Sequence, residues 1–282
     1  MKEIVLACAR GRITALRGGD PGGPRVLALH GWLDNAASFL PLSKHLEHCD
    51  LVALDLPGHG GSEHRQPGYD YAFVDWIHDG FDALDALGWQ KASLLGHSMG
   101  GAIACMMAAS LPARIERLAL IEALGPVSGK AEDAGARLRQ AVVARRALDP
   151  ARAPRTIADL DQAIAARLAV SNMSREAAKL IVERNLRVVS GGFAWRSDPR
   201  LTLPAHVRTD EAFILDWLRA IEAPTLVIAA EPAPPYFTAE QRSARAAQLR
   251  DGRVLALAGS HHLHMEQPDI VGPLIREFLA ST

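Results

Sequence analysis

Short apolar runs alternate with helix-like segments along most of the chain, which predicts strands alternating with helices. Such alternation is typical of a mostly parallel sheet covered by helices on both faces. We therefore predict an α/β fold with a mostly parallel eight-stranded sheet that opens with an antiparallel hairpin. The expected strands are residues 4–7, 13–16, 25–29, 51–54, 91–95, 117–121, 224–230 and 252–257, and the expected helices outside the central segment include residues 38–46, 76–87 and 102–109.

The pattern changes in the central segment, where strand signals cease and Ala, Arg and Leu recur at helical spacing. We predict that residues 123–223 form a helical cap, inserted after the sixth strand into a core of residues 1–122 and 224–282. The helical stretches of this cap are residues 131–148, 157–171 and 175–185.

Residues 191–200 (GGFAWRSDPR) are the most distinctive part of the expected cap. Two glycines, two aromatic residues and a proline predict a structured loop rather than a linker. Phe193 and Trp195 are candidate substrate contacts, and packing of the cap on the core is the alternative role for both.

The strongest chemical signal is the G-x-S-x-G motif formed by Gly96, His97, Ser98, Met99 and Gly100. It lies where the fifth expected strand meets an apolar helix, so the chain must turn sharply, and glycines on either side of the serine leave room for that turn. Ser98 Oγ would stand at the helix N-terminus, where the dipole and free N–H groups favour negative charge. The motif predicts Ser98 as a nucleophile, with His97 as a candidate substrate contact.

Three further stretches, taken with this motif, resemble α/β-hydrolases. Residues 30–35 (HGWLDN) resemble the H-G-x motif after the third strand, residues 55–62 (DLPGHGGS) the D-x-x-G-x-G-x-S turn, and residues 258–268 (AGSHHLHMEQP) the G-x-G-H-x-x-H-x-E-x-P stretch. The residues of these stretches are similar to those of the serine hydrolase-like family. The resemblance covers residues from about 25 to 280 and implies a capped, esterase-type serine hydrolase.

The resemblance also implies roles for particular residues. Aligned on the Glu-Gln-Pro at 266–268, the catalytic base falls on His261, which leaves His262 as an extra histidine. The backbone N–H groups of Trp32 and Met99 would form the oxyanion hole. A metal site in the histidine-rich loop is the alternative, but no Cys, Asp or Glu cluster with ligand spacing accompanies it, so no metal is expected.

The acid of the triad is where the chain departs from the common pattern. Most relatives carry an Asp after the seventh strand, where this chain has Ala233, and Glu231 lies two residues too early. A minority of relatives carry the acid after the sixth strand, where this chain has Glu122. We expect Glu122 to orient His261, with its carboxylate within about 3.2 Å of Nδ1, and keep Glu231 as the alternative.

Composition narrows the classes of partner and compartment. At 282 residues and 49% hydrophobic, the chain can bury one sizeable core plus an insertion. A net charge of −1 gives no electrostatic case for nucleic acid or anionic membrane, and no apolar run approaches the ~20 residues of a membrane span. The N-terminus enters a strand pattern rather than a signal peptide, and three scattered cysteines favour a reducing cytoplasm.

These observations together predict a monomeric or homodimeric hydrolase of small or medium carboxylic esters that needs no cofactor. A serine rather than an aspartate at position 98 argues against epoxide hydrolase and dehalogenase chemistry, which needs a carboxylate nucleophile. Lactonase, thioesterase, amidase, carbon–carbon hydrolase and perhydrolase activities share the same constellation and stay open. A ligand receptor with the hydrolase fold and negligible turnover is the alternative from another class.

Overall fold

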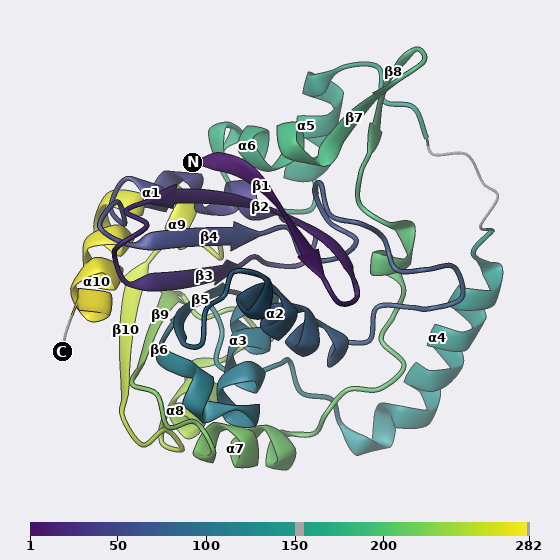
Figure 1. The fold of residues 1–282 in the computed structure, drawn as a ribbon. Helices are drawn as coiled ribbons and strands as arrows, with labels where there is room; N and C mark the ends of the chain where they lie inside the picture. Colours follow the sequence, from purple (N-terminus) through teal and green to yellow (C-terminus); the bar gives the residue numbers. More distant parts are fainter. Residues whose placement is uncertain (150–154, 281–282) are drawn as a thin grey trace.

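The central sheet has eight strands in the order β1-β2-β4-β3-β5-β6-β9-β10 in the computed structural model, which describes residues 1–149 and 155–280 (Figure 1). The pairs β1–β2 and β2–β4 are antiparallel and all the other pairs are parallel. The prediction of a mostly parallel eight-stranded sheet with an opening hairpin is confirmed. The strands are β1 (Lys2–Cys8), β2 (Gly11–Gly19), β3 (Arg25–Leu29), β4 (Asp50–Leu54), β5 (Ala92–His97), β6 (Ile115–Ile121), β9 (Thr225–Glu231) and β10 (Gly252–Ala258).

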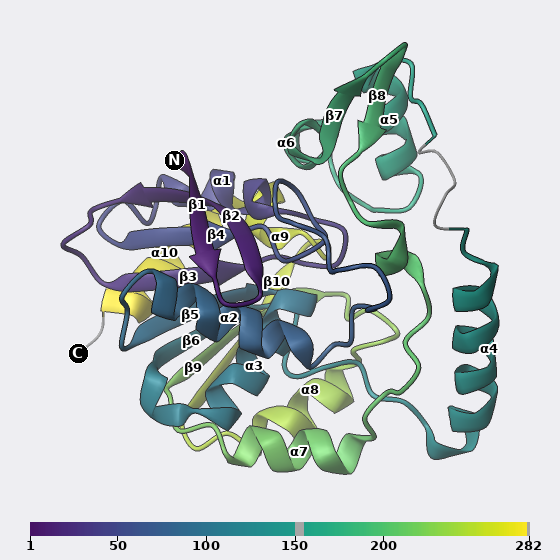
Figure 2. The same ribbon diagram turned by 45° about the vertical axis from the view of Figure 1, so that its right-hand side comes forward.

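Helices cover both faces of this sheet (Figures 1 and 2). One face packs against α2, α3, α7 and α8, and the other packs against α1, α9 and α10. The core helices are α1 (Leu40–Ser43), α2 (Asp75–Ala86), α3 (Met99–Ser110), α8 (Ala239–Ala246), α9 (Leu263–Glu266) and α10 (Pro268–Ala280).

Side chains of neighbouring residues in the central strands point to opposite faces of the sheet. In β5, Leu94 belongs to the hydrophobic cluster under α2 and α3, while Leu95 belongs to the cluster under α1 and α10. Both side chains are fully buried. Because side chains alternate along a strand, a strand covered on both faces must be apolar at every position, which is why the central strands read as continuous apolar runs.

The segment between β6 and β9 contains helices, as predicted, but is not purely helical. Its helices are α4 (Ala134–Ala147), α5 (Leu160–Leu168), α6 (Arg175–Asn185) and α7 (Glu211–Arg219). It also contains an antiparallel hairpin of β7 (Leu186–Val189) and β8 (Gly192–Trp195), so the expectation of no strands here was wrong. Of the two glycines at the start of the expected loop, Gly191 lies in the turn of this hairpin with φ +82°, and Gly192 begins β8.

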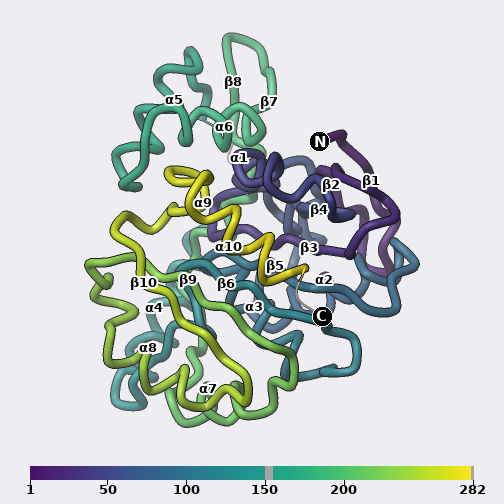
Figure 3. The backbone as a smooth tube through the Cα atoms, turned by 90° about the vertical axis from the view of Figure 1, so that its left-hand side faces the viewer, coloured from purple at the N-terminus to yellow at the C-terminus, as the bar shows by residue number. Residues whose placement is uncertain are grey.

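The elements of this segment differ in what they pack against. Helices α5 and α6 and the hairpin share a small hydrophobic cluster of their own and stand together beyond one edge of the core in the tube drawing (Figure 3). Helix α7 instead packs into the main core through Ile214 and Leu218. The division into a core and a cap at residues 123–223 stays a prediction. Within the described residues, no helix has the length and apolar character to cross a membrane.

Candidate active site

Ser98 lies between β5 and α3 in a strained backbone conformation, with φ 50° and ψ −115°. Such values are costly for a residue with a side chain and persist only where the surroundings impose them. The flanking glycines are needed because the backbone is crowded here. A Cβ on Gly96 would lie 2.5 Å from Gly101 Cα, and one on Gly100 would lie 2.0 Å from the Leu29 carbonyl oxygen. The predicted sharp turn at Ser98 is therefore present.

The parallel strands bring the other candidate residues to the same edge of the sheet. Ser98 follows β5, Glu122 follows β6 and His261 follows β10. The Ser98 N–H donates to the Ile121 carbonyl at 2.9 Å, which fixes Ser98 beside the residue that precedes Glu122. Residues about 140 positions apart thus meet because the carboxyl ends of parallel strands lie together.

Glu122 reaches His261 directly. Its Oε2 lies 3.3 Å from His261 Nδ1, slightly longer than the distance expected from the sequence, and its Oε1 accepts from the Ala230 N–H at 2.5 Å. The Glu122 backbone has φ 54°, a second strained conformation beside Ser98. The carboxylate is buried and His261 is half-buried, so the acid is fixed and the base has access to solvent.

Glu231, the alternative acid, does not meet the histidine. Its side chain is about half exposed and pairs with Arg242 at 3.3 Å. Its position at the end of β9 directs it toward α8, which carries that arginine. The geometry favours Glu122 over Glu231 as the partner of His261.

Tyr236 is a contact of His261 that the sequence did not indicate. Its hydroxyl lies 3.0 Å from His261 Nδ1, closer than the Glu122 oxygen. Burial, together with the nearby charge of Glu122, raises the pKa of Tyr236 to about 12, so the hydroxyl keeps its proton at neutral pH. It lies in the loop after β9, and no local motif marks it.

The candidate oxyanion donors are available. Within residues 1–149 and 155–280, the backbone N–H groups of Trp32 and Met99 donate no hydrogen bond. Met99 is the first residue of α3, where a backbone N–H has no partner inside the helix. In the same part of the chain Ser98 Oγ is not hydrogen-bonded to His261, a contact that commonly tightens only when substrate is bound.

The side chain of Trp32 contacts the inserted segment. Its Nε1 donates to the Leu201 carbonyl at 2.9 Å, and the ring is about half exposed. The next residue, Leu33, has φ 59°, a third strained position near the site. The contact with Leu201 thus fixes the loop after β3 on one side, while the backbone N–H of Trp32 stays free.

Two histidines in the supporting loops are structural. His30 Nε2 accepts from the Leu56 N–H at 3.0 Å, and His59 lies against the Leu56 and Pro57 carbonyls at 3.3 Å. Burial lowers the pKa of His30 to about 4 and that of His59 to about 3, so both are neutral at pH 7. Neither approaches the triad as a second base.

His97 does not have the position expected of a substrate contact. It is fully buried, and its Nε2 lies 2.8 Å from the His261 carbonyl oxygen. Burial lowers the pKa of His97 to about 4. Its other nitrogen faces Asp34 and the side chain of His262, so the expected substrate contact does not fit this structure.

Phe193 and Trp195 lie on β8 and pack with the small cluster under α5 and α6. The hairpin that carries them stands at the outer edge of the inserted segment (Figures 1 and 2). The packing role is the one this structure displays, and substrate contact by either residue stays a prediction.

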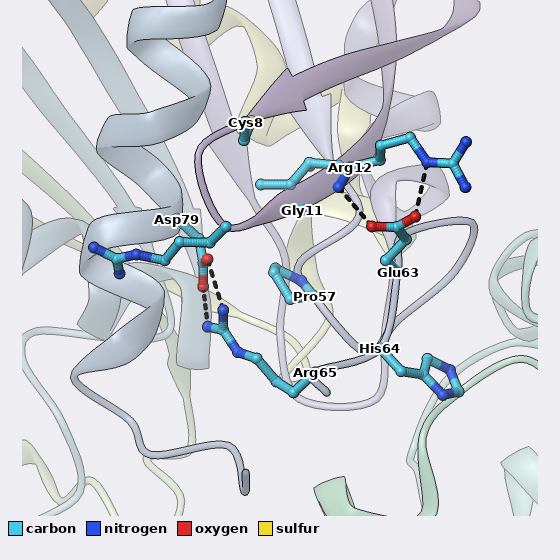
Figure 4. A pocket seen from close by; sticks show the side chains of 10 residues that line it. Cys8, Gly11, Arg12, Pro57, Glu63, His64, Arg65 and Asp79 are labelled. Atoms are coloured by element: carbon cyan, nitrogen blue, oxygen red, sulfur yellow. Dashed lines mark hydrogen bonds and ion pairs between the residues drawn. The ribbon is translucent and has the colours of Figure 1, made fainter. Parts of the chain in front are cut away.

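A pocket beside the turn between β1 and β2 is separate from these residues (Figure 4). Its charged side chains already pair, Arg12 with Glu63 at 2.8 Å and Arg65 with Asp79 at 3.0 Å. Ion pairs thus balance most of the charge in this pocket, and none of the candidate catalytic residues lines it.

Comparison with known proteins gives three kinds of similarity. Residues 24–266 match the family model described as alpha/beta hydrolase fold. A serine hydrolase-like protein of Danio rerio is 31% identical over 271 residues, covering 93% of this chain and 83% of that protein. The crystal structure of a hypothetical protein from Pseudomonas aeruginosa PAO1 superposes with a TM-score of 0.92, 38% identity and complete coverage of both chains. A thioesterase domain from a curacin biosynthetic pathway, at 22% identity, TM-score 0.85 and 98% coverage of each chain, shares the fold.

Proposed function

This chain belongs to the α/β-hydrolase fold family and is a serine hydrolase, and we propose that it cleaves small or medium carboxylic esters through an acyl-enzyme intermediate. The observation that carries the proposal is the contact between Glu122 and His261 beside the strained Ser98. A carboxylate, an imidazole and a serine at a helix N-terminus are the parts that acyl transfer needs.

In this proposal, Ser98 Oγ attacks the ester carbonyl carbon while His261 Nε2 accepts the hydroxyl proton. The developing oxyanion is held by the free N–H groups of Trp32 and Met99. The C–O bond of the ester then breaks, and His261 gives the proton to the departing alcohol. Water, deprotonated by His261, then attacks the acyl carbon. The bond to Ser98 Oγ breaks as His261 returns the proton to that oxygen, which releases the carboxylic acid and restores Ser98.

Glu122 has two tasks in this cycle. It accepts from His261 Nδ1, which leaves Nε2 free to receive the serine proton, and its negative charge stabilises the imidazolium. Its own orientation is fixed by the Ala230 N–H. Tyr236 shares the Nδ1 contact and acts as a positioning residue for the histidine.

The choice of ester is the finer part of the proposal. Thioesters, lactones, amides, carbon–carbon bonds and perhydrolysis use the same nucleophile, base and oxyanion donors. The similarity to a thioesterase domain is at the level of fold, so it does not favour a thioester. A receptor that binds a ligand without turnover is the alternative from another class, and an assembled Glu122–His261 pair argues against it.

The test is a substrate panel measured with wild type and Ser98→Ala side by side. The panel contains p-nitrophenyl esters of graded acyl length, the matched thioesters and a set of lactones. We expect esters of short or medium acyl length to have the highest kcat/KM, with no turnover by Ser98→Ala. Preference for thioesters or lactones would replace the substrate class, and tight ligand binding without turnover would support the receptor.

The cellular setting we propose is a cytoplasmic enzyme, monomeric or homodimeric, that acts on a small molecule without a cofactor. Cys8, Cys49 and Cys105 are all free in the structure, which supports a reducing compartment. Burial raises the pKa of Cys8 and Cys49 to about 11 and that of Cys105 to about 12, so these thiols stay protonated.

A further inference from the structure

A second group of polar side chains lies behind the candidate triad. Asp34 comes from the loop after β3, His97 from the end of β5 and His262 from the loop after β10, and one ligand atom from each lies within 4.8 Å of the others. All three residues are at least 95% buried. Residue spacing within one segment does not predict this group, because only the fold brings the three residues together.

Two of the three separations in this group match those around a tetrahedral ion. Asp34 Oδ2 lies 3.3 Å from His262 Nε2 and 3.6 Å from His97 Nδ1. Imidazole nitrogens and carboxylate oxygens bind zinc at about 2.0 to 2.2 Å, so two such ligands at a tetrahedral angle are about 3.3 to 3.5 Å apart. The carboxylate oxygen is therefore positioned to share one ion with each histidine.

The protonation of His97 and Asp34 is compatible with a bound cation. His97 Nε2 lies 2.8 Å from the His261 carbonyl oxygen, which only accepts, so Nε2 carries the hydrogen. In a neutral ring, Nδ1 then has a lone pair, and it faces the Asp34 carboxylate. Both Asp34 Oδ2 and His97 Nδ1 are buried without a hydrogen-bond partner within the described residues. Two facing acceptors in a buried site are unfavourable unless a positive charge lies between them.

The surrounding contacts are those of a metal site. A metal-bound histidine commonly donates its other N–H to a carbonyl, as His97 does to His261, and a ligating carboxylate is itself hydrogen-bonded. Arg167 donates to the second oxygen of Asp34. Gly31 keeps the space beside the ligand atoms open, because a Cβ there would lie 2.9 Å from His97 Nδ1 and 3.1 Å from Asp34 Oδ2.

We infer that Asp34, His97 and His262 bind one divalent transition-metal ion of the zinc class. Two imidazoles and one carboxylate suit Zn²⁺ and its neighbours rather than Mg²⁺ or Ca²⁺, which prefer oxygen ligands. The ion connects the loop after β3, the residue before Ser98 and the residue after His261. It lies behind the triad, and the proposed ester cleavage does not pass through it.

Zinc and cobalt titration of chelator-stripped protein tests this site. Wild type should bind one equivalent of Zn²⁺ by calorimetry, and Co²⁺ in its place should give the strong visible absorption of tetrahedral coordination. His262→Ala should bind at least tenfold to a hundredfold more weakly, since loss of an outer-shell partner alone has that effect. Circular dichroism of metal-free His262→Ala, compared with metal-free wild type, guards against a variant that fails only by unfolding.

Two controls locate the ion. His78→Ala changes an exposed histidine on α2 and should bind as wild type does. His261→Ala should also retain one equivalent, because the ion is not held by the catalytic base. No binding by wild type, equal binding by His262→Ala, or loss of binding in His261→Ala would each overturn the assignment. Ester turnover is measured separately, so failure of the metal site and failure of the esterase proposal are distinguishable.

Discussion

Two carboxylate–histidine groups lie back to back beside Ser98, and they differ in exposure and in what balances their charge. Glu122 with His261 has one member open to solvent, since the His261 side chain is 28% exposed. Asp34 with His97 and His262 is closed, with side-chain exposures of 6% or less. A base must meet its substrate, so only the first group can serve catalysis directly.

The charge balance of the two carboxylates also differs. Asp34 Oδ1 accepts from Arg167, a charged partner that is held inside the closed group. Glu122 has a backbone N–H and a histidine as partners and no arginine contact within the described residues. Its charge is therefore available to an imidazolium that forms during reaction. The same residue types thus form a solvent-accessible pair, which we propose is catalytic, in one place and a closed group in the other.

The largest expected effect is at Ser98, the proposed nucleophile beside the two carboxylate–histidine groups. Ser98→Ala removes one hydroxyl from a partly buried residue, so the fold should persist while ester turnover falls by about 10⁶-fold, as in other serine hydrolases. A fluorophosphonate probe should label wild type and leave Ser98→Ala unlabelled. Labelling that persists in the variant would refute the assignment.

The two adjacent histidines test the comparison most directly. His261→Ala should lower kcat by roughly 10³-fold or more, because it removes the base. His262→Ala, measured with chelator present, should be much milder, since this ring belongs to the closed group. Reversed effects would show that the open and closed groups have been interchanged.

The acid is tested by a matched pair of glutamines. Glu122→Gln keeps the shape but removes the charge that stabilises the imidazolium, so kcat should fall by up to about 10⁴-fold. Glu231→Gln should be nearly silent because that carboxylate pairs with Arg242 at the surface. A large loss in Glu231→Gln alone would return the acid to the end of β9, and no loss in either would leave a Ser–His dyad.

The closed group should matter more for stability than for chemistry. Asp34→Asn leaves Arg167 buried without its counter-charge, which costs about 3 kcal/mol of unfolding free energy. Urea denaturation with chelator present measures this loss, and Lys179→Ala, which breaks an exposed pair with Glu183, is the control expected to change stability by less than about 0.5 kcal/mol. Equal stability of both variants would contradict a stabilising role for the closed group.

The smallest expected effect is at Tyr236. Tyr236→Phe removes a neutral hydrogen bond to His261 Nδ1, which corresponds to about 1 kcal/mol, or roughly a fivefold fall in kcat/KM. The pH profile of kcat/KM should shift with it, because the hydroxyl contacts the titrating ring. An unchanged rate together with an unchanged profile would show that the hydroxyl does not position the base.

The fold and the candidate nucleophile could be predicted from the sequence because both depend on local patterns. Apolar runs separated by helices predict a parallel sheet, and the glycines around Ser98 mark a turn that a Cβ would block. The hairpin of β7 and β8 could not be predicted in this way because each strand has only four residues. So short a stretch does not establish an alternating pattern, and its glycines were interpreted as a loop.

By itself, the sequence determined which residue types stand at the end of each strand: Ser98, His261 and two competing glutamates. Only the tertiary structure shows which glutamate lies beside His261, because strand order places Glu122 there and α8 gives Glu231 an arginine partner. It alone brought Tyr236 to the base and joined Asp34 to His97 and His262. Contacts between distant segments depend on how strands pair and loops close, and no local pattern of residues contains that information.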